Sequence, residues 1–219
     1  MLLFGPRRAG KSTLIKYWCY CWQDRFDKVV VMSTTNFTGF FTEFVNPKCC
    51  FEEYNPEVLH NMLNFQRNTP ADKRMRILLI LDDVLDQERE LRTSGPLKTM
   101  FTMGRHFRMS VAVCSQYVKS IPTPWRRNCD IVAVFFSRSG DMLHIFHQEL
   151  FADLTYRQFV HLLQDVSYDH GCLIVKPCMN SRCFDDVYQQ ARAQEHGKFV
   201  MGDLTKKEQE AQAEEDEDS

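Results

Sequence analysis

The chain has 219 residues, a length that fits one domain with at most a short appendage. Hydrophobic residues make up 44% of it, which is enough for a packed core and excludes a chain that is disordered throughout. Residues 203–219 hold eight acids and two lysines, so residues 1–202 carry +4 although the net charge is −2. We therefore expect a folded domain over residues 1–202 and an acidic, disordered tail over residues 203–219.

The N-terminal third alternates strand patterns with helix patterns. Residues 1–4 read as the end of a strand, residues 11–23 as an amphipathic helix, and residues 29–32 as a buried strand that ends in a polar loop. Pro56 begins a second helix that extends to about Arg67. The expected inner sides of the two helices are Leu14, Trp18, Cys21 and Trp22 in the first, and Val58, Met62 and Phe65 in the second.

The same alternation continues to the end of the folded part. Residues 77–81 form a continuous apolar run, typical of a strand buried on both faces in a parallel sheet. The later expected elements are a helix at 96–107, strands at 110–114 and 131–136, two helices within 141–165 that separate near 153–155, and a strand at 172–175 beside which Cys183 and Phe184 return. This order predicts an α/β fold with a mostly parallel sheet flanked by helices, whose ligand lies at the carboxyl ends of the strands.

The nine cysteines do not predict a disulfide framework. Their number is odd, and Cys19, Cys21, Cys114 and Cys172 lie within apolar runs, which favours buried reduced thiols. Neither the spacing of Cys178 and Cys183 nor the pair His144 and His147 supplies a full set of zinc ligands, so we expect no zinc. No apolar stretch approaches the roughly 18–20 residues of a membrane-spanning helix, so we also expect no membrane span.

Residues 5–12, Gly-Pro-Arg-Arg-Ala-Gly-Lys-Ser, match the P-loop pattern G-x-x-x-x-G-K-[S/T] at every fixed position. Gly10 allows the backbone to approach phosphates, and the N–H groups that open the next helix form an anion nest. Lys11 supplies a charge to the β- and γ-phosphates, and Ser12 offers its hydroxyl to Mg²⁺. The predicted nucleotide-binding residues are Gly5, Pro6, Arg7, Arg8, Ala9, Gly10, Lys11, Ser12 and Thr13, with ATP and Mg²⁺ as the ligands. Such a loop normally follows a buried strand of about five residues, so we expect the first strand to be truncated.

Three further polar side chains follow buried strands. Asp82 ends the apolar run at 77–81, where a carboxylate holds Mg²⁺ in P-loop proteins. Asp83 is suited to polarising an attacking water, and the alternative is that it caps the next helix. Gln116 follows the strand at 110–114, where it contacts the γ-phosphate or the water unless it is simply a solvated strand end.

The combination of Asp83 and Gln116 favours hydrolysis over other P-loop chemistry. A nucleoside or nucleotide kinase needs an acceptor pocket and a lid rather than a water-activating acid with a polar sensor. A second alternative is a scaffold that binds ATP and turns it over little. The sequence thus predicts an ATPase with a RecA-like P-loop NTPase fold.

Three segments resemble the genome-packaging ATPases of large DNA viruses, the poxvirus-type branch of the FtsK/HerA superfamily. They are residues 5–13, the run Leu-Leu-Ile-Leu-Asp-Asp-Val-Leu at 78–85, and the run Gly-Arg-His-Phe-Arg-Met-Ser-Val-Ala-Val-Cys-Ser-Gln at 104–116. Residues 122–128 are similar to the segment that follows the glutamine strand in those proteins, and the resemblance spans residues 2–136. Asp83 stands where Glu is common in the superfamily at large.

The resemblance implies a homo-oligomeric ring that translocates double-stranded DNA into a viral capsid. It also implies Lys11, Ser12, Asp82, Asp83 and Gln116 in the roles given above. It implies an arginine that reaches the γ-phosphate of a neighbouring subunit, with Arg105 as the first candidate and Arg127 as the second. The expected location is the cytoplasm or virus factory of an infected host cell, or the virion.

The charge of +4 is modest for a protein that binds DNA, but a ring concentrates it in a pore where phosphate contacts are independent of sequence. The basic clusters to test are Lys73, Arg74 and Arg76, and Arg105 and Arg108.

Overall fold

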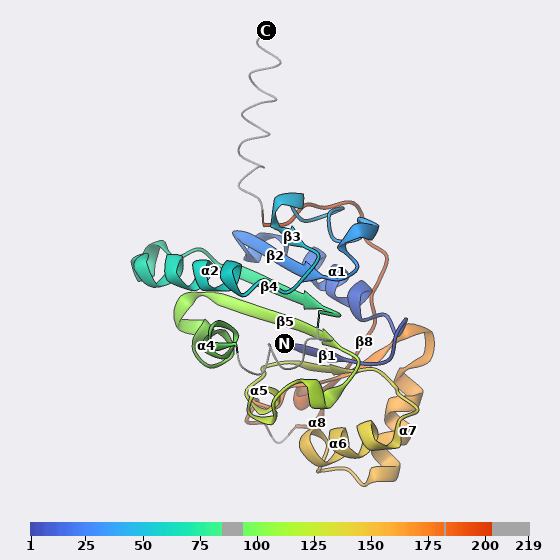
Figure 1. Cartoon of the computed structure of the whole chain (residues 1–219). Coiled ribbons are helices and arrows are strands. Elements are labelled where there is room, and N and C mark those ends of the chain that lie inside the picture. Colours follow the sequence, from blue (N-terminus) through green and yellow to red (C-terminus); the bar gives the residue numbers. More distant parts are fainter. Residues whose placement is uncertain (85–93, 182, 203–219) are drawn as a thin grey trace.

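The computed structural model describes residues 1–84, 94–181 and 183–202. The acidic tail expected at residues 203–219 lies outside this part of the chain. The centre of the molecule is a twisted eight-stranded sheet with the order β3-β2-β4-β5-β1-β6-β7-β8 (Figure 1). The strands are β1 Leu2–Phe4, β2 Lys28–Ser33, β3 Cys50–Phe51, β4 Ile77–Asp82, β5 Met109–Ser115, β6 Val132–Val134, β7 Cys172–Val175 and β8 Tyr188–Ala191.

The six strands from β3 to β6 in the sheet are parallel, whereas β7 is antiparallel to β6 and β8 is antiparallel to β7. The strands β2, β4 and β5 are mostly apolar and are buried except at Lys28 and Ser110, because both faces of the sheet are covered. The predicted α/β fold with a mostly parallel sheet is therefore confirmed.

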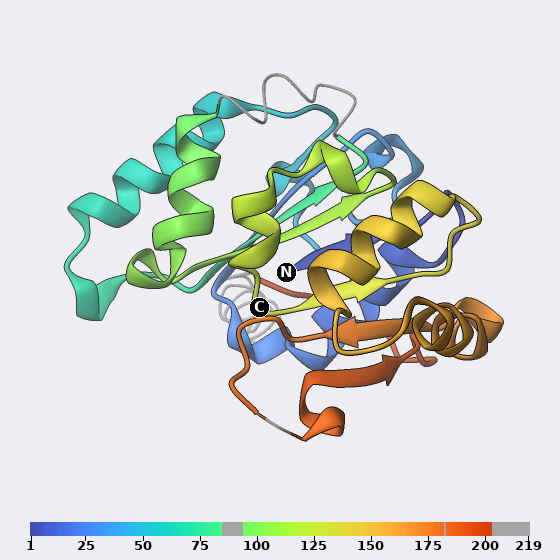
Figure 2. The ribbon, with the colours of Figure 1, turned by 90° about the horizontal axis from the view of Figure 1, so that it is seen from below.

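The two faces of the sheet are covered differently. Helices α2, α4, α5, α6 and α7 pack on one face and share its apolar core (Figure 2). The other face is covered by α1, by the aromatic loop around Phe41 and Phe44, and by the segment that includes Phe199 and Met201. The helices are α1 Lys11–Cys21, α2 Pro56–Asn68, α4 Gly95–Met103, α5 Thr123–Arg127, α6 Gly140–Leu150, α7 Tyr156–Val166 and α8 Phe184–Val187, with 3₁₀ turns η6 Gly104–Phe107 and η8 Tyr168–His170.

The predicted inner side of α1 was partly wrong. Leu14, Ile15 and Cys19 are buried against the sheet, while Cys21 is exposed. The large rings of Trp18 and Trp22 stack on each other, with centroids 5.7 Å apart, at the half-buried margin of the helix. The narrow stripe that faces the sheet is thus filled by smaller side chains.

The predicted inner side of α2 was also partly wrong, because Val58 and Met62 pack against the core but Phe65 does not lie inside. Leu59, Leu63 and Gln66 are buried, and Phe65 is 52% exposed. Gln66 is buried because its amide nitrogen donates to the carbonyl oxygens of Met75 (2.6 Å) and Phe107 (2.7 Å). A polar side chain with such partners competes successfully with a phenyl ring for an inner position.

The return strand was predicted at the wrong residues. Cys183 and Phe184 lead into the short helix α8, and the strand beside β7 is Tyr188–Ala191. The ring of Phe184 packs on Tyr188, whose own ring stacks on Phe151 under the sheet. Burial of Tyr188 therefore sets the register of β8.

Candidate nucleotide-binding site

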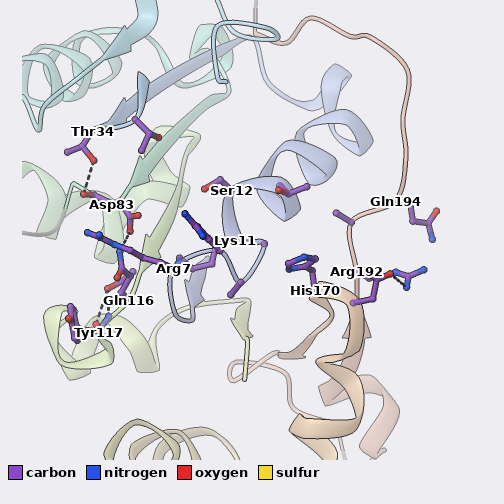
Figure 3. Close-up of a pocket in the computed structure, with 18 of the residues that line it drawn as sticks. Arg7, Lys11, Ser12, Thr34, Asp83, Gln116, Tyr117, His170, Arg192 and Gln194 are labelled. Atoms are coloured by element: carbon purple, nitrogen blue, oxygen red, sulfur yellow. Dashed lines mark hydrogen bonds and ion pairs between the residues drawn. The ribbon is translucent and has the colours of Figure 1, made fainter. Parts of the chain in front are cut away.

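Of the residues predicted to bind nucleotide, Arg7 to Thr13 line one cleft of about 1070 Å³ at the carboxyl ends of the parallel strands, whereas Gly5 and Pro6 are not part of its lining (Figure 3). The loop after β1 lies in its middle, and Asp83 after β4 and Gln116 after β5 lie on one side of that loop. Crossover connections bring these loops to the same edge because the strands run in the same direction. Residues next to the antiparallel strands β7 and β8 also line the cleft.

The loop from Gly5 to Gly10 leads directly into α1. Gly10 is the N-cap residue with φ +100°, a left-handed conformation that only glycine adopts without strain. A β-carbon there would lie 3.1 Å from the β-carbon of His170, so a side chain at this position would also be crowded. Lys11 is buried, and its Nζ donates to the carbonyl oxygens of Gly5 (3.0 Å) and Pro6 (2.9 Å). The ammonium is thus held over the concave side of the loop.

Ser12 and Asp82 meet beneath this loop. The Ser12 hydroxyl donates to Oδ2 of Asp82 at 2.8 Å, and the buried Oδ1 of Asp82 accepts no hydrogen bond from the described residues. Burial raises the pKa of the Asp82 carboxyl, and the Ser12 hydroxyl, the Cys114 thiol and the Lys11 ammonium oppose that rise. One hydroxyl and one carboxylate oxygen with spare bonding capacity fit a Mg²⁺ ion that keeps several of its waters.

Asp83 and Gln116 contact each other across the ends of β4 and β5. Nε2 of Gln116 donates to Oδ1 of Asp83 at 3.2 Å, and the Thr34 hydroxyl donates to the Asp83 carbonyl at 3.4 Å (Figure 3). Asp83 has φ +51°, an uncommon conformation that turns its side chain into the cleft rather than along the strand. The alternative that Asp83 caps a following helix falls on residues 85–93, which lie outside the described residues.

The residues on the far side of the cleft were not predicted from the sequence. Asp169 and His170 from η8, and Arg192 and Gln194 after β8, line it opposite Asp83 and Gln116 (Figure 3). No motif marks them. The only signal for them in the sequence was the strand expected at 172–175, whose antiparallel direction was not predicted.

The two candidates for a trans-acting arginine lie away from the cleft of their own chain. Arg105 is in η6, at the end of the sheet opposite to the P-loop, and it is 79% exposed and paired with Asp130. Arg127 ends α5 and is exposed. Neither is brought together with Lys11 and Asp83 within one chain.

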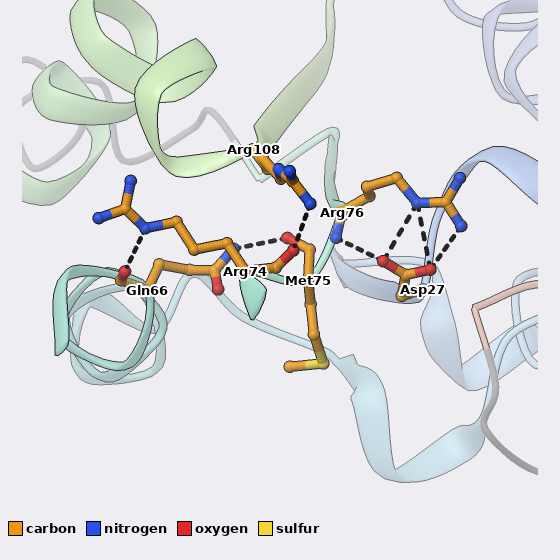
Figure 4. A network of polar contacts seen from close by, with 6 residues as sticks. All are labelled: Asp27, Gln66, Arg74, Met75, Arg76 and Arg108. Carbon is orange, nitrogen blue, oxygen red and sulfur yellow. Dashed lines mark hydrogen bonds and ion pairs between the residues drawn. The ribbon is translucent and has the colours of Figure 1, made fainter. Parts of the chain in front are cut away.

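The basic cluster around Arg74 connects the beginnings of β4 and β5 to α2 and η6 (Figure 4). Arg74 donates to the carbonyl oxygens of Gln66 (2.8 Å) and His106 (2.6 Å), and Arg108 donates to the carbonyl of Arg74 (3.2 Å). Arg76 pairs with Asp27 at 2.5 Å. These guanidinium groups therefore join backbone segments at this edge of the sheet.

The pair His144 and His147, weighed above as zinc ligands, contacts neighbouring residues of the same chain. The ring of His144 stacks on Tyr156 with centroids 4.3 Å apart, and Nε2 of His147 lies 2.7 Å from the carbonyl oxygen of Leu154. Within residues 1–84, 94–181 and 183–202, no three His, Cys, Asp or Glu side chains gather as a metal site. In the same part of the chain, no helix has the length and apolar character needed to cross a membrane.

The chain is similar to known viral proteins over most of its length. A model of the Poxvirus A32 protein family matches residues 1–202. The uncharacterized protein 088R of Invertebrate iridescent virus 3 is 26% identical over 191 residues, which cover 85% of this chain and 72% of that protein. The uncharacterized protein 015R of Frog virus 3 is 24% identical, and the match covers 84% of this chain but only 54% of that relative.

The fold is shared with a solved structure. The genome packaging NTPase B204 from Sulfolobus turreted icosahedral virus 2, solved in complex with AMPPCP, superposes with a TM-score of 0.64. The match covers 89% of this chain and 97% of that chain at 14% sequence identity. At this identity the likeness establishes the fold: a P-loop ATPase sheet flanked by helices.

Proposed function

The chain belongs to the Poxvirus A32 protein family, and from this membership we propose that it is an ATP-hydrolysing motor that moves double-stranded DNA into a viral capsid. The observation that carries the proposal is the single cleft that holds Lys11, Asp83 and Gln116 together at the ends of three neighbouring strands. The described residues of this cleft supply the parts that hydrolysis of a nucleoside triphosphate requires: an anion nest, a fixed cation and a carboxylate beside a polar sensor.

Each residue of the cleft has a part in the proposed reaction. The loop from Gly5 to Thr13 binds the phosphates through its N–H groups, and Lys11 exchanges its bonds to the loop carbonyls for bonds to phosphate oxygens. Ser12 and Asp82 hold Mg²⁺, which supplies charge neutralisation at the phosphates when it is bound. Asp83 accepts a proton from the attacking water, and Gln116, already 3.2 Å from that carboxylate, orients the water.

The motor acts as a homo-oligomeric ring in this proposal. An arginine of one subunit completes the site of its neighbour, with Arg105 as the first candidate because it is exposed and lies away from its own cleft. The ring would work in an infected host cell, in its cytoplasm or virus factory, or in the virion. A ring concentrates the basic charge of the folded part around the DNA.

The test is the ATP turnover of the full chain with and without double-stranded DNA, for the wild type and Asp83→Asn. We expect DNA to raise turnover of the wild type, and Asp83→Asn to lower kcat by about 10²–10⁴-fold, since the variant keeps the shape of the side chain but loses the base. The matched control is Asp72→Asn, an exposed aspartate at the opposite end of the sheet, which should leave both rates unchanged.

Each other outcome contradicts a defined part of the proposal. Turnover that ignores DNA would overturn the motor, and turnover that survives Asp83→Asn would overturn the role of Asp83. Transfer of phosphate to a nucleoside or nucleotide would identify a kinase instead. Tight ATP binding without turnover, with or without DNA, would identify a scaffold.

A further inference from the structure

We propose that η8 and the segment 192–195 form the subsite that binds the nucleoside part of the nucleotide, with His170 and Arg192 as the residues that set its affinity. The ligand class is a planar nucleobase on a ribose, held beside the P-loop. This inference rests on the proposed function, because it concerns the same cleft. It goes further by assigning residues outside every nucleotide-binding motif of the chain.

The topology of the sheet brings these two segments to the P-loop. Because β7 is antiparallel to β6, it begins at the edge where the parallel strands end, and η8 immediately precedes it. Because β8 is antiparallel to β7, with Ala191 opposite Cys172, it ends at that same edge. The residues before β7 and after β8 therefore lie side by side next to the loop that follows β1.

The order of residues along the cleft orients a bound nucleotide. Asp83 and Gln116 lie on one side of Lys11, whereas His170, Arg192 and Gln194 lie on the other (Figure 3). The terminal phosphate has to face Asp83, where the attacking water is held, so the nucleoside extends in the opposite direction. There it meets His170, which approaches the P-loop so closely that a β-carbon at Gly10 would lie 3.1 Å from it.

An ion pair and a strained turn shape this wall. Nη1 of Arg192 donates to the Asp169 carboxylate at 2.7 Å, and both side chains are more than half exposed. Asp169 and His170 both have left-handed backbones, with φ +50° and +61°, a strained pair that the tight turn before β7 imposes. The neighbouring turn is crowded as well, since a β-carbon at Gly171 would lie 2.0 Å from the Val166 carbonyl.

The residues that follow the segment 192–195 contact α1 and the loop at Phe44. The ring of His196 stacks on Tyr20 of α1 with centroids 5.1 Å apart, and Phe199 stacks on Phe44 at 5.0 Å. The N–H of Met201 donates to the carbonyl of Phe44 at 2.8 Å. Figure 1 shows this segment passing along α1. The chain that follows the wall is thus packed against α1, the helix that begins at the P-loop, and against the loop that holds Phe44.

The chemistry of the wall suits a nucleobase. A guanidinium held by a carboxylate and an imidazole are both flat groups that stack on a base without regard to its edge. The Gln194 amide and the backbone groups around it offer donors and acceptors to that edge. In the proposed site, Lys11 and the N–H groups of the loop bind the phosphates, which leaves Arg192 and His170 for the base.

The experiment compares the binding of ATP and of inorganic tripolyphosphate to the full chain, in the presence of Mg²⁺, for Arg192→Ala and His170→Ala. Tripolyphosphate has the phosphates of ATP but no nucleoside. We expect each variant to lower the affinity for ATP by about tenfold and to leave the affinity for tripolyphosphate unchanged, because only a stacking contact with the base is lost. The matched controls are Arg157→Ala and His161→Ala, two exposed side chains on α7 outside the cleft, which should change neither affinity.

The two ligands separate failure of the subsite from failure of the proposed function. Unchanged ATP affinity in both variants, or an equal loss for ATP and tripolyphosphate, would overturn the subsite while the ATPase proposal stands. A wild type that binds neither ligand, or Lys11→Ala that binds both as the wild type does, would overturn the P-loop assignment itself. A selective loss for ATP supports the subsite.

Discussion

The two ends of the sheet carry similar residue types but use them differently. At the carboxyl end, Lys11 is buried and donates to two carbonyl oxygens of the P-loop. Asp82 there has one buried oxygen without a hydrogen-bond partner among the described residues. At the amino end, Arg74 and Arg76 are occupied by backbone carbonyls and by Asp27. At the carboxyl end, charged groups that can still form hydrogen bonds lie around a cleft. At the amino end, the charged groups already have partners within the chain and stabilise the fold.

This difference shows that clusters of charge in a sequence are a weak guide to ligands. The arginines at 74, 76 and 108 look like a surface for phosphates, yet each donates to groups of the same chain. The three predictions that follow would break or sharpen the contrast.

The largest expected effect is that of Arg105→Ala. If this exposed arginine completes the neighbouring site, its loss lowers ATP turnover of the assembled protein by about 10³-fold or more while ATP binding is kept. The amino end of the sheet in one subunit would then form part of the active site of the next subunit. The difference between a ligand-binding end and a structural end of the sheet would hold only within a single chain. Turnover and ATP affinity are measured on the same preparations.

A mixing experiment separates action in trans from a structural effect. Arg105→Ala and Asp83→Asn subunits, each inactive alone, should regain part of the turnover when mixed, because a neighbour can supply the missing arginine. Asp130→Asn, which removes the partner of Arg105, serves as the control and should retain turnover. A mixture that stays inactive would contradict the role of Arg105.

The second effect is that of Arg74→Ala on stability. This variant leaves the carbonyls of Gln66 and His106 without their donor, and we expect the free energy of unfolding to fall by about 1–2 kcal/mol. Affinity for ATP should not change, since the cleft is at the other end of the sheet. Denaturant unfolding and ATP titration test this together, with exposed Arg157→Ala as the control. A stable variant that loses affinity for DNA would instead make this end a binding surface.

The smallest effect is that of Asp82→Asn in the absence of nucleotide and Mg²⁺. Burial raises the folded-state pKa of this carboxyl above its usual value of 3.8, so its ionised form costs stability at neutral pH. The cost is present above the folded-state pKa and disappears as the pH falls through that pKa toward 3.8. Asparagine carries no charge and can still accept the Ser12 hydrogen bond, so we expect the variant to be about 1 kcal/mol more stable at pH 7.

The pH dependence distinguishes this explanation from a general change in packing. The stability gain of Asp82→Asn should shrink as the pH is lowered and vanish near pH 4, whereas Mg²⁺-dependent ATP binding should be lost at every pH. Urea unfolding at pH 7, 5.5 and 4 tests this. A variant that is less stable than the wild type at pH 7 would show that the carboxylate stabilises the fold.

Much of the fold could be predicted because strong local signals mark it. The apolar run at 77–81 forms a strand, and helices lie on either side of residues 153–155, as expected. The second of these helices begins at a capping box formed by Thr155 and Gln158. The inner sides of α1 and α2 could be predicted only in part. Which of several apolar stripes faces the sheet depends on partners such as the carbonyls that hold Gln66, and these come from distant residues.

The sequence by itself determined one side of the site. The P-loop from Gly5 to Ser12 is a local structure, in which the spacing of glycine, lysine and serine alone suffices to form an anion nest at a helix start. Asp82, Asp83 and Gln116 follow directly from strands whose carboxyl ends meet at one edge of a parallel sheet. The family resemblance of residues 2–136 is confirmed by the family match, which extends it to residues 1–202.

Only the tertiary structure decided the other side. Asp169, His170 and Arg192 reach the cleft because β7 and β8 reverse direction, and strand direction is set by pairing between strands, not by the residues within one strand. Whether a charged group is free or satisfied was decided in the same way, since the partners of Arg74 and Arg76 come from α2, from η6 and from the loop before β2. Local sequence places chemical groups along the chain, and long-range pairing determines which of them remain available to a ligand.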